Sequence, residues 1–258
     1  MSDSLGDRMK KNYENRARLY LTRRTPVIIR VDGKAFHTYT KRFDRPFDPR
    51  VEYAMDCAAQ EILMNAQGCK LAYRQSDEIS FLLTDWDKLD TSAWFDYNVQ
   101  KLCSVAASMA TMAFNGGMLS GGKFKSGETI PINAMFDART FNIPREEITN
   151  YFLWRAKDWY RNSVTMYTQT FFSHTQLHGQ SVANMHDMLH SIGKNWRHDL
   201  TMAQKNGRFW YRRTGTPVPV SEDNLPPKYE FVDKLVQDLM PVTLNTVGAE
   251  TGRTECKS

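Results

Sequence analysis

The chain has 258 residues, 41% of them apolar, and a net charge of +5. This length can bury a substantial hydrophobic core, and the absence of any run of about 18 apolar residues argues against a membrane span. The four cysteines, at positions 57, 69, 103 and 256, lack the close CxxC spacing of a zinc site. We therefore expect reduced thiols in a cytoplasmic protein.

The positive charge is unevenly distributed. Seven Lys or Arg residues and one Glu lie between Arg8 and Arg24, and "RFWYRR" (208–213) interleaves cations with aromatic residues. Cations can pair with phosphates and aromatic rings can stack on bases, so both segments are candidate RNA contacts. For each segment alone, the alternative is an ordinary solvated face.

The first 142 residues predict four strands and two helices. β-Branched and apolar runs predict strands at 27–33, 69–73, 79–83 and 129–139. Apolar residues at three- and four-residue steps predict helices at 49–67 and 92–114, the second ended by Gly116 and Gly117. A glycine-rich, basic loop (116–128) follows that helix. The order β-α-β-β-α-β is that of ferredoxin-like folds.

The sequence predicts that the remainder of the chain is helical. Helices are predicted after Pro144, in "SVANMHDMLHSIG" (181–193) and in "EFVDKLVQDLM" (230–240). We therefore expect an α+β protein. Residues 1–142 would form the core with its basic N-terminal segment, and residues 143–258 would form a helical extension packed on it.

The predicted topology brings acidic residues together. The third strand lies between the first and second and runs antiparallel to both, so Asp32, at the end of the first strand, and the turn carrying Asp77 and Glu78 share one edge of the sheet. Clustered carboxylates repel one another unless a cation intervenes, and Mg²⁺ prefers oxygen ligands. Two such ions can orient an attacking oxygen and neutralise a leaving pyrophosphate. The alternative is that Asp32-Gly33 and Ser76-Asp77 are ordinary turn residues.

Four motifs resemble the tRNA(His) guanylyltransferase family, including its tRNA 5′-end-repairing relatives. They are "RVDGKAFH" (30–37), "RQSDEISF" (74–81), "FDAR" (136–139) and "YFLWR" (151–155). The resemblance spans residues 27–155. It implies a catalytic core like the palm of nucleic-acid polymerases. It also implies that this core adds nucleotides to the 5′ end of tRNA in the 3′-5′ direction. It also implies two Mg²⁺ ions, ATP or GTP as activating and substrate nucleotides, no membrane association, and a homo-oligomer, commonly a tetramer.

The resemblance also implies roles for individual residues. Asp32, Asp77 and the Gly33 carbonyl would hold the metal ions, and Glu78 would support them as a third catalytic residue. The implied nucleotide contacts are Asp32, Gly33, Lys34, Ala35, Phe36, His37, Arg45, Ser76 and Asp77. The implied RNA contacts are Arg155, Asn162, Arg212 and Arg213.

One departure bears on specificity. Eukaryotic guanylyltransferases carry a "HINNLYNT"-type motif where this chain reads "WYRNSVTMYT" (159–168), so Tyr160 replaces the histidine while Asn162 persists. This favours template-dependent repair of tRNA 5′ ends, and addition of a single G to tRNA(His) remains the alternative.

Three other interpretations fit the sequence less well. A nucleotide cyclase would carry a "GGDEF"-like turn, which "RQSDE" does not match. A non-catalytic RNA-binding module would need exposed aromatic residues on the two central strands, and "VIIRV" has none. The pairs His174/His178 and His186/His190 have the spacing of zinc ligands on a helix, but no third ligand is evident.

Overall fold

The centre of the protein is an antiparallel sheet of six strands. The computed structural model describes residues 4–121, 129–212, 216–220 and 227–240. The strand order is β4-β1-β3-β2-β5-β6. The strands are β1 (Val27–Gly33), β2 (Cys69–Gln75), β3 (Glu78–Leu83), β4 (Phe136–Asn142), β5 (Arg208–Tyr211) and β6 (Val218–Val220). The order of the first four strands confirms the predicted ferredoxin-like arrangement within an α+β fold.

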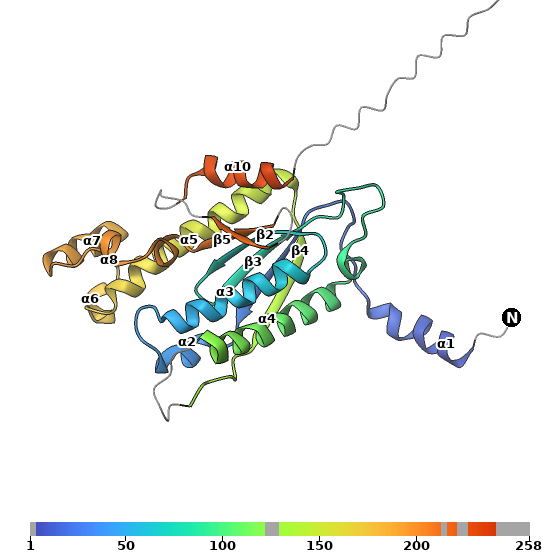
Figure 1. The fold of residues 1–258 in the computed structure, drawn as a ribbon, viewed down its shortest axis with the longest axis horizontal. Helices are drawn as coiled ribbons and strands as arrows, with labels where there is room; N and C mark the ends of the chain where they lie inside the picture. Colours follow the sequence, from blue (N-terminus) through green and yellow to red (C-terminus); the bar gives the residue numbers. More distant parts are fainter. Residues whose placement is uncertain (1–3, 122–128, 213–215, 221–226, 241–258) are drawn as a thin grey trace, which may run out of the picture.

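Helices cover both faces of this sheet (Figure 1). The longer ones are α3 (Pro49–Asn65) and α4 (Val99–Gly121) on one face, and α5 (Ile148–Thr168) and α10 (Tyr229–Leu239) on the other. The others are α1 (Leu5–Asn12), α2 (Phe36–Tyr39), α6 (His174–Leu177), α7 (Val182–Ser191), α8 (Trp196–Asp199) and α9 (Met202–Asn206). Short 3-10 turns occupy Glu14–Ala17, Thr40–Arg42, Trp94–Tyr97 and Arg145–Glu147.

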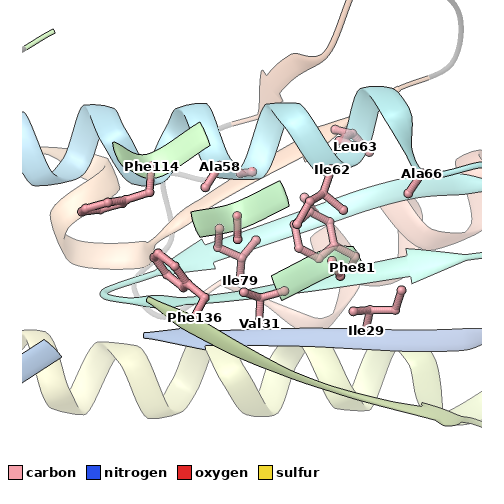
Figure 2. Close-up of a cluster of buried hydrophobic side chains, with 14 of the residues drawn as sticks. Ile29, Val31, Ala58, Ile62, Leu63, Ala66, Ile79, Phe81, Phe114 and Phe136 are labelled. Carbon is pink, nitrogen blue, oxygen red and sulfur yellow. The ribbon is translucent and has the colours of Figure 1, made fainter. Parts of the chain in front are cut away.

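Strand β1 supplies apolar side chains to both layers. Ile29 and Val31 pack against α3 and α4, in the cluster drawn in Figure 2, whereas Ile28 packs in a second cluster with Phe152 of α5. Side chains alternate between the faces of a strand, so a strand covered on both faces is apolar throughout. A third cluster around Trp196 joins the C-terminal half of α5 to α7 and α8.

Helix α4 differs from the prediction at both ends. It begins at Val99, after Phe95, Asp96 and Tyr97 with positive φ, and it continues past the two glycines to Gly121. A Cβ on Gly117 would lie 2.9 Å from the Cα of Ala54, so this glycine permits close packing of α4 on α3 instead of ending the helix. Residues 116–121 of the expected loop are therefore helical, and its residues 122–128 lie outside the described part.

Helix α4 is also long and apolar enough to cross a membrane by length and composition. Its buried residues pack against α3 and the sheet as part of the first cluster. These buried residues make up about a third of its most apolar stretch.

The fourth strand lies later in the chain than predicted. Strand β4 spans Phe136–Asn142 instead of 129–139, and it pairs with β1 from Val27↔Asn142 to Gly33↔Phe136. The segment before it is held to α4 without forming a strand, because the Asn115 side chain hydrogen-bonds the backbone N–H and C=O of Ala134. The prediction mistook this apolar connection for part of the strand.

The C-terminal segment contains strands that the sequence analysis missed. Strand β5 pairs with β2 and β6 pairs with β5, so they extend the core sheet. Phe209 and Trp210 of β5 are 2% and 7% exposed and belong to the clusters on opposite faces. The prediction that the aromatic residues of "RFWYRR" stack on RNA bases is wrong for these two, because both are core residues.

Candidate active site

The acidic residues of β1 and β3 meet at one edge of the sheet, as predicted. Asp32 pairs in register with Glu78, and the backbone N–H of Gly33 donates a 3.1 Å hydrogen bond to the carbonyl of Asp77. The turn carrying Asp77 therefore contacts the end of β1, although 45 residues separate Asp32 from Asp77 in the sequence.

Local backbone geometry explains why this contact is close. A Cβ on Gly33 would lie 2.2 Å from Cδ2 of Phe36, so only glycine lets the Phe36 ring cover this point of the chain. Between β2 and β3, Ser76 adopts a φ of 46°, a conformation that favours glycine. Such a conformation in a non-glycine residue costs free energy and is concentrated at functional sites.

In the described part of the chain, no cationic side chain forms an ion pair with the carboxylate of Asp77. Burial raises its pKa to about 6, and the negative charges of Asp32 and Glu78 act in the same direction. Asp32 is partly exposed, and its carboxylate lies 3.6 Å from Nη2 of Arg139. A cation between Asp32 and Asp77 would relieve the repulsion.

The donors present suit Mg²⁺ if a nucleotide completes the shell. Among the residues that the structure describes, no group of three His, Cys, Asp or Glu side chains is placed to hold a metal ion. Mg²⁺ is usually bound by one or two carboxylates, waters and substrate phosphates instead of an all-protein cage. Asp32, Asp77 and the Gly33 carbonyl, all oxygen donors, match that requirement.

Glu78 has a different environment from the other two acids. Its carboxylate accepts two 2.8 Å hydrogen bonds from Arg155 of α5 and one of 3.2 Å from Gln75. Arg30 lies 3.8 Å away on the same face. The charge of Glu78 is therefore neutralised by protein groups. Its contact with Arg155 holds the strand that begins directly after Asp77.

The same contacts bear on the predicted role of Arg155. Its side chain is only 10% exposed and its guanidinium is engaged with Glu78 and Asp158. The expectation that Arg155 contacts RNA is therefore contradicted by its burial. We assign it to positioning Glu78.

A cavity of about 320 Å³ opens beside Asp77. Its polar side contains His37, Ser76 and Asp77, and its apolar side contains Phe47 and Trp159, whose rings contact edge to face. The remaining lining residues are Phe36, Thr40, Phe43, Asp44, Pro46, Asp48, Val51, Glu52, Met55, Arg74, Met166 and Ala203. A cavity lined by aromatic side chains and by Asp77 suits a nucleoside whose phosphates reach a metal at Asp77.

The sequence analysis missed part of this cavity. Neither Phe47 nor Trp159 was singled out as a site residue. They belong to segments more than a hundred positions apart, so no local pattern could have indicated that they line one space. Their aromatic character was the only signal.

The remaining predicted nucleotide contacts lie around this edge. Lys34, Ala35 and Arg45 are exposed, and Arg45 lies between Asp44 and Pro46, both of which line the cavity. Phe36 contributes its ring to both the core and the cavity wall. The structure thus brings the predicted nucleotide-binding segments to one region.

The predicted RNA contacts are more scattered. Asn162 is exposed on α5, within 3.5 Å of Asp158. Arg212 donates hydrogen bonds to the carbonyls of Leu63 and Met64 at the end of α3, which is a helix-capping contact. Arg213 lies outside the described residues.

Two of the basic N-terminal residues and two of the histidines also have defined surroundings. Arg23 binds Asp85 and Asp96, and Arg24 donates to the backbone near residue 88, so these cations hold loops together. The rings of His174 and His178 are 6.4 Å apart. No third metal ligand accompanies them in the described chain, so zinc binding gains no support.

Known proteins match this chain in sequence and in fold. The profile of the Thg1 family, described as tRNAHis guanylyltransferase, matches residues 6–144. The tRNA(His) guanylyltransferase of Schizosaccharomyces pombe is 31% identical over 220 residues, which are 78% of each chain.

Two solved structures are also similar. A bacterial tRNA(His) guanylyltransferase (Thg1)-like protein in complex with ATP is 40% identical, with a TM-score of 0.80, over 90% of this chain and 99% of that one. A bacterial Thg1-like protein in complex with GTP is 38% identical, with a TM-score of 0.73, over 91% and 99% of the two chains. Shared motifs, shared fold and a family match over more than half of the sequence lead to one conclusion: this chain belongs to the Thg1 family of tRNA(His) guanylyltransferases.

Proposed function

We propose that this protein is a Mg²⁺-dependent nucleotidyltransferase that adds nucleotides to the 5′ end of tRNA in the 3′-5′ direction. The observation that carries the proposal is the convergence of Asp32 and Asp77 at the edge of a cavity of nucleoside size. Similarity to Thg1-like proteins in complex with ATP and GTP supports nucleoside triphosphates as the ligands.

Each part of the site has a task in this reaction. Asp32, Asp77 and the Gly33 carbonyl would hold Mg²⁺, which would supply charge neutralisation of the phosphates and orientation of the attacking hydroxyl. The aromatic cavity would hold the base and exclude water from it, with His37 and Ser76 at the phosphate side. The Arg155–Glu78 pair keeps the turn that bears Asp77 in place.

Within this activity, we propose template-dependent repair of truncated tRNA as the cellular reaction. Tyr160 occupies the position of the histidine in eukaryotic guanylyltransferases. Its hydroxyl lies 3.5 Å from Nε2 of His186, and its ring packs edge-on against Trp196. This residue is therefore engaged in packing between helices. Watson–Crick pairing with the opposite strand would select the incoming nucleotide, so the protein itself need not read bases.

The alternative of a non-catalytic RNA-binding module is less well supported. Such a module needs an open sheet face, and helices cover both faces of the central strands here (Figure 1).

A homo-oligomer remains part of our proposal. Exposed apolar residues on α4 and the segment before β4 offer an area for it: Met112, Leu119, Ile132 and Met135.

The decisive experiment is an extension assay. The protein is incubated with Mg²⁺, NTPs and 5′-labelled tRNAs that lack one or more 5′ nucleotides, with the opposing base varied. We expect extension that matches the opposing base on several tRNAs. Addition of G to tRNA(His) alone, whatever base stands opposite, would establish the guanylyltransferase reaction instead, and no extension by folded protein would exclude both.

A further inference from the structure

Helix α5 carries the one exposed tryptophan of the chain. All six tryptophans lie in the described residues, and Trp154 is 52% exposed while the other five are buried or half-buried. The ring is held in place, because the Tyr151 ring packs edge-on at 5.9 Å and Cζ of Arg155 lies 4.5 Å from the ring centroid. An exposed and immobilised indole costs little further entropy when a flat partner stacks on it.

Cations flank this ring on the same face of α5. Residues three and four apart share a helix face, so Lys157 and Arg161 follow Trp154 along one line. Both are exposed. Asp158 is half-buried and paired with Arg155 and Arg161, which reduces its repulsion of a polyanion. Together with Asn150 and Leu153, these residues line a shallow groove of about 540 Å³, here called the α5 groove.

The α5 groove is connected to the candidate active site. Arg155, next to Trp154 in the chain, binds Glu78, and Glu78 is the register partner of Asp32. One turn further on, Trp159 of the same helix lines the nucleotide cavity. Residues 154, 157 and 161 point away from the side of α5 that carries Trp159, because these positions differ by more than a quarter turn around the helix axis. The groove and the cavity therefore lie on different sides of one helix, and Arg155 of that helix binds Glu78.

We propose that the α5 groove binds the acceptor end of the RNA substrate, with one unpaired base stacked on Trp154 and neighbouring phosphates paired with Lys157 and Arg161. The inference rests on the proposed function, because it takes RNA as the substrate. Beyond the proposed function, the inference specifies the side of α5 from which the RNA approaches the carboxylates. A protein partner is less suitable, because lysine is depleted at protein interfaces, whereas Lys157 lies exposed beside this ring. Alternating rings and cations are typical of single-stranded nucleic-acid sites.

The first test uses Trp154 as its own probe. Acrylamide quenching of tryptophan fluorescence reports the exposed indole, and we expect a tRNA transcript lacking its first nucleotide to protect it. The protection should be absent in Trp154→Phe. Quenching that is unaffected by tRNA at saturating concentration would overturn the proposal. Protection that increases with protein concentration without RNA would identify a second copy of the chain as the occupant, and would also overturn it.

The second test measures binding of the same transcript to variants. Loss of one base stack corresponds to about a 5- to 150-fold higher Kd, which we expect for Trp154→Ala. Trp154→Phe should retain most of the affinity, and the double variant Lys157→Glu/Arg161→Glu should lower the salt dependence of binding. Tyr229→Ala and Lys234→Glu on α10 are controls, since both residues are exposed and neither lines the groove.

The outcomes separate this inference from the proposed function. If the wild type extends truncated tRNA and Trp154→Ala binds it with unchanged affinity, the groove assignment is wrong while the proposed function stands. If the wild type binds no RNA, both fail. Lys157→Glu alone changes only an exposed side chain, so loss of affinity in this variant cannot be ascribed to misfolding.

Discussion

Arg155 of α5 donates from Nε and Nη2 to the two carboxylate oxygens of Glu78 on β3, each at 2.8 Å. Both residues are at most 9% exposed. This pair ties the helix to the strand that begins directly after Asp77. Breaking a buried pair by removing one partner leaves an uncompensated charge, which is far more costly than removing both partners.

The pair predicts non-additive stability. Arg155→Met and Glu78→Gln should each lower the free energy of unfolding by about 3–5 kcal/mol. The double variant should lose less than the sum of the two, with a coupling of about 1–3 kcal/mol. Urea denaturation of the four proteins measures this cycle, and strictly additive losses would show that the two side chains do not interact.

Asp77→Asn should separate function from stability. Burial and the nearby acids raise the pKa of Asp77 to about 6 in the folded protein, above its unfolded value, so ionisation at pH 7 opposes folding. The amide removes that charge, and we expect unchanged or higher thermal stability together with loss of nucleotide transfer. Mg²⁺ with ATP should raise the Tm of the wild type but not of this variant. Asp90→Asn, in an exposed loop, is the control; an equal Mg²⁺ response of the Asp77 and Asp90 variants would refute the metal assignment.

Asp48 predicts acid sensitivity at the start of α3. Burial acts to raise its pKa, but hydrogen bonds from the Arg50 side chain and from the N–H groups of Asp44 and Arg50 outweigh it, so the pKa is lowered. A lowered pKa contributes stability that is present above the unfolded pKa of about 3.9 and is lost as the pH falls through the folded pKa.

Asp48→Asn should therefore be less stable than the wild type at pH 7 by about 1–2 kcal/mol, since a charge-assisted hydrogen bond is replaced by a neutral one. The difference should shrink as the pH falls below about 3.9. Urea denaturation at several pH values checks this, with Glu146→Gln as an exposed control. A difference independent of pH would mean that the charge of Asp48 has no part in stability.

Two neighbouring glycines of α4 predict opposite effects. A Cβ on Gly117 would meet the Cα of Ala54 at 2.9 Å, whereas one on Gly116 would meet nothing within 4 Å. Gly117→Ala should cost about 1–3 kcal/mol through overpacking. Gly116→Ala should raise the free energy of unfolding by about 0.5–1 kcal/mol, because alanine loses less conformational entropy than glycine when a helix forms. Thermal unfolding of both variants tests the close approach of α4 to α3, and equal stabilisation would rule it out.

The acidic edge could be predicted from the sequence because its determinants are local. β-Branched runs bounded by glycine and proline indicate strands, and the order of strands and helices limits the topologies that can connect them. Given that topology, the end of β1 and the β2–β3 turn must share an edge, which placed Asp32 beside Asp77. The structure confirmed this through the contact between Gly33 and Asp77.

Other features depend on partners far away in the chain. The glycines of α4 do not reveal from their own sequence whether they end a helix. In the same way, "RFWY" does not reveal whether it lies on a surface or extends a sheet. Gly117 continues a helix because α3 lies against it, and residues 208–211 form a strand because the edge of β2 is open to pair.

By itself, then, the sequence determined the strand order of the core, the acidic edge and the family motifs, since these follow from local periodicity and residue chemistry. Only the tertiary structure decided that Arg155 holds Glu78 and that Phe47 and Trp159 enclose a cavity. The physical reason is that burial and ion pairing are properties of the space between distant segments, and that space exists only after the chain has folded.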